Sequence, residues 1–105
     1  PDGALLAGLV DARLAGMIAC RPLAPGICEM KRLYVRPFAR GCGLARALVG
    51  RLEDEARQRG YREIYLDTLP PMGEAQRLYE TLGFVDIAPY YDTPIAGTRF
   101  MRKAI

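Results

Sequence analysis

The sequence predicts one domain of the α+β class, a mixed β-sheet of the α/β type with helices packed on it. Short apolar runs at strand spacing alternate with two stretches in which apolar residues recur every three or four positions. Glycines and prolines separate these segments. The chain has 105 residues and half of them are apolar, which suits a single core over residues 1–105.

The first part of the chain is predicted to form three antiparallel strands. They are expected at Ala4–Val10, Arg13–Cys20 and Ile27–Val35. Asp11-Ala12 reads as a two-residue hairpin turn between the first two strands. A proline- and glycine-containing loop over residues 22–26 is expected to join the second strand to the third, which Pro37 then ends.

From Gly43 the apolar period becomes that of a helix, and Gly60 is a suitable C-terminal stop. The apolar stripe of this helix consists of Leu44, Leu48, Leu52 and Ala56. A strand at Glu63–Thr68, a helix at Glu74–Leu82 and strands at Phe84–Ile87 and Thr98–Arg102 follow. The order is β-β-β-α-β-α-β-β, and the β-α-β crossover makes two strands of the sheet parallel.

Composition excludes several classes of function. The net charge is +3 with dispersed Lys and Arg, which gives nucleic-acid binding little support. No apolar run approaches the ~20 residues of a membrane span. The three cysteines have no C-x-x-C spacing and histidine is absent, so we expect no metal site and reduced thiols in a cytoplasm. Without histidine, a general base must be a carboxylate, cysteine, tyrosine, lysine or water.

The segment Arg40-Gly41-Cys42-Gly43-Leu44-Ala45 predicts an anion site. A small-residue turn that opens a helix leaves backbone N–H groups without partners at the positive end of the helix dipole. A P-loop is excluded because no Lys-Ser or Lys-Thr pair exists, and a dinucleotide fingerprint because its third glycine position holds Arg46. The alternative interpretation is a helix start that needs glycines only for a tight turn.

Two segments resemble the GNAT superfamily of acyl-CoA N-acyltransferases. Residues 29–37 with 40–45 are similar to its cofactor motif, and Ala75–Phe84 to its A-x-x-L-Y-x-x-x-G-F motif. The ending from Pro89 to Met101 resembles a bacterial branch of uncharacterised members. Against this family pattern the chain is expected to lack the N-terminal strand and helices, and Met72 stands where many members carry an asparagine.

The resemblance implies transfer of an acetyl group from acetyl-CoA to a primary amine by direct attack in a ternary complex. It implies that the strand before the turn binds the pantetheine arm and that the turn binds the diphosphate. The cofactor-binding residues are then Leu33, Tyr34, Val35, Arg40, Gly41, Cys42, Gly43, Leu44 and Ala45. Arg46, one turn into the helix, is either a further phosphate contact or an exposed helix residue.

The resemblance also implies two catalytic residues, Glu29 as general base and Tyr79 as general acid for the departing thiolate. Strand alternation puts Glu29 on the same face as Leu33 and Val35. The alternatives are that Glu29 is paired with Lys31 or an arginine, and that Tyr79 packs in the core as part of an apolar helical stripe.

Tyr90, Tyr91 and Asp92 lie in the last long loop, where aromatic rings beside an acid suit a cationic amine acceptor. The alternative is a loop that its tyrosines merely pin in place. A nucleophilic role for Cys42 is disfavoured because it lacks a histidine partner. A noncatalytic acyl-CoA-binding or sensing module is the rival function, and an uncovered strand edge would favour a homodimer.

Overall fold

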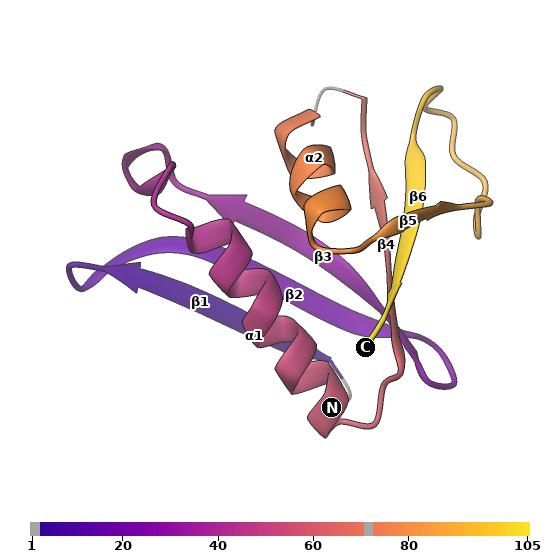
Figure 1. Ribbon diagram of the computed structural model, residues 1–105, viewed down its shortest axis with the longest axis horizontal. Helices are drawn as coiled ribbons and strands as arrows, with labels where there is room; N and C mark the ends of the chain where they lie inside the picture. Colours follow the sequence, from indigo (N-terminus) through magenta and orange to yellow (C-terminus); the bar gives the residue numbers. More distant parts are fainter. Residues whose placement is uncertain (1–2, 71–72) are drawn as a thin grey trace.

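The computed structural model describes residues 3–70 and 73–105, so the expectation for Met72 lies outside the described residues. The predicted class and element order are confirmed (Figure 1). The strands are β1 (Ala4–Val10), β2 (Arg13–Ala24), β3 (Ile27–Val35), β4 (Glu63–Thr68), β5 (Val85–Ile87) and β6 (Arg99–Ala104). The helices are α1 (Leu44–Gln58) and α2 (Gly73–Thr81), and a 3₁₀ turn, η1 (Pro37–Ala39), precedes α1. In the part of the chain that the structure describes, no helix is long and apolar enough to cross a membrane.

The six strands form one mixed sheet in the order β1-β2-β3-β4-β6-β5. Only β3 and β4 are parallel, as the crossover through α1 requires. Their pairing stops after three residue pairs, the last of which is Glu29 with Tyr65. Beyond it the two strands diverge, and α2 lies over the gap between them (Figure 1). The sheet is therefore split at its centre.

The loop predicted at residues 22–26 is shorter than expected. β2 continues through Pro22, which pairs with Cys28, and ends at Ala24. Proline is tolerated there because β1 begins opposite Cys20 and does not extend as far as Pro22. No β1 residue therefore needs a hydrogen bond from the N–H that proline lacks. The predicted two-residue hairpin is confirmed: Asp11 and Ala12 both have positive φ, as a type I′ turn needs.

The core lies between one face of the sheet and the two helices, and we call this the helix face. α1 turns its apolar stripe to the sheet, and Val49, Leu52 and Ala56 have no exposed area. The start of α1 comes close because β2 has a glycine there: a Cβ at Gly16 would lie 2.7 Å from the Tyr34 carbonyl oxygen and 3.2 Å from the Leu44 side chain. The helix start is thus pressed against the end of β3.

A β-bulge in β3 corrects one expectation. Between the pairs Ala19–Lys31 and Met17–Tyr34, β3 has one residue more than β2, and Arg32 has a φ of 59°. The extra residue reverses the alternation, so Val35 faces the helices while Glu29 faces the other way. The prediction that Glu29 shares a face with Leu33 and Val35 is therefore wrong. We call the face of Glu29 the open face.

Candidate functional site

The turn between η1 and α1 has the geometry of an anion site. Gly41 and Gly43 have φ of 82° and 81°, a conformation that L side chains rarely adopt. No side chain caps α1, and its first turn contains no acidic residue. The backbone N–H groups of that turn are therefore left for an anion, at the positive end of a 15-residue helix. Arg40 adds a cation, and its Nε donates to the Val35 carbonyl oxygen at 3.1 Å.

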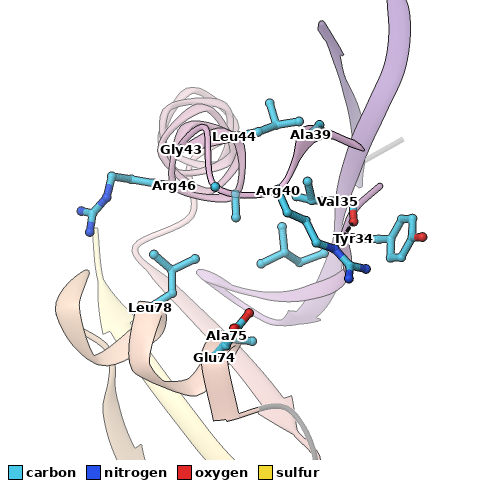
Figure 2. Close-up of a pocket in the computed structure, with 13 residues that line it drawn as sticks. Tyr34, Val35, Ala39, Arg40, Gly43, Leu44, Arg46, Glu74, Ala75 and Leu78 are labelled. Atoms are coloured by element: carbon cyan, nitrogen blue, oxygen red, sulfur yellow. Dashed lines mark hydrogen bonds between the residues drawn. The ribbon is translucent and has the colours of Figure 1, made fainter. Parts of the chain in front are cut away.

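This turn opens into a cleft of about 580 Å³ (Figure 2). One wall comes from the end of β3, the turn and the start of α1, and the other from α2. Arg40 and Arg46 extend toward opposite sides of the cleft in Figure 2. An elongated ligand with an anionic group at the turn fits this arrangement, with its length running along β3.

Eight of the nine predicted cofactor-binding residues line the cleft, namely Leu33, Tyr34, Val35, Arg40, Gly41, Gly43, Leu44 and Ala45, as does Arg46. Among the described residues Cys42 is the exception: its thiol donates to the Ala39 carbonyl oxygen at 2.8 Å. Glu74, Ala75 and Leu78 of α2 also line the cleft, and the sequence analysis missed them. These three residues reach the cleft only because α2 packs across the gap between β3 and β4. Two of them, Ala75 and Leu78, are the alanine and leucine of the A-x-x-L part of the second motif.

A second cavity, of about 150 Å³, occupies the split between β3 and β4, and we call it the slot. Leu33 lines both cavities, so the slot adjoins the cleft at this residue. Tyr79 lines the slot from α2. Tyr79 is only 6% exposed, and its ring centroid lies 5.7 Å from that of Phe84, so it packs in the core as the alternative interpretation expects. Burial raises the pKa of Tyr79 to about 12, so the phenol keeps its proton at neutral pH.

On the open face, Glu29 is fully enclosed by hydrogen-bond donors. It is 1% exposed. Its Oε1 accepts from Arg21 Nε at 2.7 Å and its Oε2 accepts from the Tyr90 hydroxyl at 2.6 Å. Lys31 Nζ lies 3.5 Å from Glu29 Oε2 and donates to Asp67 Oδ1 at 3.2 Å. The ion-paired alternative for Glu29 is the arrangement that the structure contains.

The last loop is held against this network by its two tyrosines. Tyr91 donates to Asp67 Oδ2, and Tyr90 stacks edge-on against Phe100. Burial alone would raise the pKa of Asp67, but the hydrogen bonds from Tyr91 and Lys31 outweigh it and keep the pKa below its ordinary value. Asp92 is exposed on the same loop. The predicted acceptor residues therefore lie beside the predicted base, on the open side of the slot.

A cleft at a glycine turn, with an adjoining slot between two splayed parallel strands, is the arrangement of an acyl-CoA N-acyltransferase fold. The chain matches the model of the acetyltransferase (GNAT) family over residues 1–84 and belongs to that family. It is 41% identical over 104 residues to an uncharacterised N-acetyltransferase of Schizosaccharomyces pombe, covering 97% of this chain and 64% of that protein. It is 36% identical over 104 residues to an IAA acetyltransferase of Azospirillum brasilense, covering 92% and 67% respectively.

Solved structures contain the fold of nearly all of this chain. A Klebsiella pneumoniae protein named as an acyl-CoA N-acyltransferase superposes with a TM-score of 0.91 at 30% identity, covering 98% of this chain and 72% of that one. A Thermoplasma acidophilum N-acetyltransferase solved with coenzyme A has the same fold, with a TM-score of 0.84 at 23% identity over 99% and 62% of the two chains. The first three curated relatives are matched over 32% to 64% of their own length, and relatives come from bacteria and eukaryotes alike.

Proposed function

We propose that this domain is an acetyltransferase that moves an acetyl group from acetyl-CoA to a primary amine by direct attack in a ternary complex. The observation that carries the proposal is the succession of the uncapped helix start, the cleft along the end of β3 and the adjoining slot at Tyr79. A CoA diphosphate needs the N–H groups and Arg40 at one end, and its thioester needs a protected space at the other. The coenzyme A in the Thermoplasma protein, which has this fold, supports the same choice of ligand.

Proton transfer would divide between the two faces. Amine nitrogen attacks the thioester carbon and loses a proton on the open face, and the departing thiolate takes the proton of Tyr79 on the helix face. Because Glu29 is enclosed, the amine proton would pass to the Tyr90 oxygen while the Tyr90 proton moves to Glu29 Oε2. Tyr91 and Asp92, both exposed on the loop above, would select a cationic acceptor.

One observation favours the rival function, a noncatalytic acyl-CoA-binding module. Both Glu29 oxygens already accept hydrogen bonds, from Arg21 and Tyr90, as expected of a structural ion pair. Both functions use the cleft to bind acyl-CoA. They differ in whether Glu29 and Tyr79 then catalyse transfer of the acyl group to an amine.

Thermal unfolding with acetyl-CoA, CoA and ATP tests the cleft. We expect both CoA species to raise the midpoint and Arg40→Glu to reduce that rise, because charge reversal repels the diphosphate. Arg62→Glu, at an exposed position outside the cleft, is the control. No stabilisation by any CoA species would refute the proposal.

Turnover with a panel of primary amines separates the enzyme from the binding module. Glu29→Gln and Tyr79→Phe should bind acetyl-CoA like the parent and release free CoA about 100-fold more slowly, the lower end of the effect expected of a lost general acid or base. Equal turnover in both variants would exclude these two residues from the chemistry. Binding without turnover by the parent would favour the noncatalytic module.

A further inference from the structure

Thr68 carries a buried hydroxyl that no other part of the described chain satisfies. It is the last residue of β4 and is 3% exposed. Within residues 3–70 and 73–105, its Oγ1 is the one buried side-chain oxygen or nitrogen without a hydrogen-bond partner. Buried hydroxyls are normally paired, so an orphan of this kind calls for an explanation.

The position of Thr68 at a cavity explains why its hydroxyl has no partner within the protein. Thr68 lines the slot together with Tyr79 and Leu33. β4 buries every second side chain, so Thr68 is on the helix face with Ile64 and Leu66, the face from which Tyr79 enters. One edge of β4 is occupied by β6, where Thr68 pairs with Arg99, and β3 has already diverged from the other edge. The hydroxyl therefore stands where the sheet is open.

If the proposed function holds and the slot binds the thioester of acetyl-CoA, hydrogen-bonding chemistry indicates which ligand atom the Thr68 hydroxyl would contact. The Thr68 hydroxyl can donate one hydrogen bond, so an acceptor bound in the slot would satisfy it. Near its reactive end a thioester offers one strong acceptor, the carbonyl oxygen, whereas sulfur accepts hydrogen bonds weakly. The slot holds about 150 Å³, enough for an acetyl thioester and too small for the nucleotide end of the ligand.

We propose that Thr68 is a catalytic residue whose hydroxyl donates a hydrogen bond to the carbonyl oxygen of the bound thioester. When the amine nitrogen bonds to the carbonyl carbon, the π electron pair moves onto that oxygen. The hydrogen bond then stabilises the negative charge until the C–S bond breaks and the carbonyl re-forms. Donors already in position are most effective at such a developing oxyanion, because they need no reorganisation.

Thr68→Val and Thr68→Ser test this role. Valine has the shape of threonine without the hydroxyl, so the free protein should unfold at the same temperature as the parent or higher, since an unsatisfied group is removed. Affinity for CoA, which has no thioester carbonyl, should be unchanged. Affinity for acetyl-CoA should fall about fivefold, the equivalent of one hydrogen bond. On the best amine of the panel, kcat should fall about 100-fold, as for loss of one oxyanion donor.

Thr68→Ser keeps the donor and should retain acetyl-CoA affinity. Thr81→Val is the matched control, because its hydroxyl is exposed on α2 and bonds only the Arg77 carbonyl among the described residues. Acetyl-CoA binding by Thr68→Val at parental affinity, or equal losses for CoA and acetyl-CoA, would overturn the assignment. If Thr68→Val fails to fold, Thr68→Ala carries the same comparison. A parent that binds no CoA species refutes the proposed function instead, so the two failures are distinct.

Discussion

The two faces of the sheet are built on opposite principles. On the helix face, Ile18, Leu52 and Met101 have no exposed area, and two helices cover them. On the open face, Leu5 and Leu9 are each 65% exposed. The open side nevertheless buries the Glu29 carboxylate, which is 1% exposed and enclosed by cations and a hydroxyl. Apolar burial stabilises the first face, and directed polar contacts organise the second.

The two faces communicate at the slot. Tyr79 and Thr68 reach it from the helix face, and Lys31 and Asp67 line it from the open face. A reaction that needs an acid on one side and a base on the other can use this split, because a ligand between the strands is accessible from both. The comparison thus predicts that stability and chemistry respond to substitutions on different faces.

The largest expected difference concerns two leucines. Leu52→Ala should lower the free energy of unfolding by about 3 kcal/mol, because it leaves a cavity under α1. Leu5→Ala should cost less than about 0.5 kcal/mol, since the side chain is already mostly in water. Urea titration monitored by circular dichroism measures both. Similar losses would mean that the open face is covered in solution.

The next difference is in alkaline stability. Burial raises the pKa of Tyr79 to about 12, from 10.0. Between these values the unfolded state loses the proton and the folded state keeps it, so stability is complete below pH 10 and falls as pH rises. The loss is about 1.4 kcal/mol per pH unit. Tyr79→Phe should remove this part of the slope, whereas Tyr34→Phe, at an exposed ring, should leave it.

On the open face, Tyr91 is the counterpart of Tyr79, and the two pKa values are compared by changing the salt concentration. A hydrogen bond to Asp67, more than burial, raises the pKa of Tyr91 to about 12. Absorbance titration of phenolate in 0.05 M and 1 M NaCl should show the Tyr91 pKa moving downward with salt by more than the Tyr79 pKa. Tyr91 contacts the Asp67 charge at an exposed site that salt can screen, whereas burial is the main cause of the Tyr79 shift. Tyr91→Phe and Tyr79→Phe assign the two transitions. Equal salt responses would contradict the distinction between the faces.

A smaller effect is expected from the loop. Tyr90→Phe takes a donor from the buried Glu29 carboxylate and should cost about 2 kcal/mol, in the range for hydrogen bonds to charged groups. Tyr91→Phe should cost less, because Tyr91 is 41% exposed and water can replace the lost donor to Asp67. Chemical denaturation at pH 7 measures both. If Tyr91→Phe lowers the free energy of unfolding as much as Tyr90→Phe or more, burial of Glu29 does not strengthen its hydrogen bond to Tyr90.

The parts of the site that the sequence predicts are those with strong local requirements. Gly41 and Gly43 are recognisable because only glycine adopts their φ readily, and the helix after them is marked by its apolar period. The contribution of Leu78 to the cleft depends on where α2 packs, which no local pattern specifies. The orphan hydroxyl of Thr68 is likewise invisible, since it results from β3 turning away from β4.

The bulge at Arg32 explains why the face of Glu29 could not be predicted, and it provides the last test. An arginine in the sequence gives no sign of a positive φ, so the sequence predicts plain alternation along β3. In the left-handed region an L residue is strained by about 1–2 kcal/mol, whereas glycine is unstrained but loses more entropy on folding, by about 0.5–1 kcal/mol. Arg32→Gly should therefore stabilise the protein by up to about 1 kcal/mol and leave CoA binding intact, and Arg32→Val should destabilise it. If valine were tolerated as well as glycine, β3 would have no bulge in solution, and Glu29 would return to the face of the cleft.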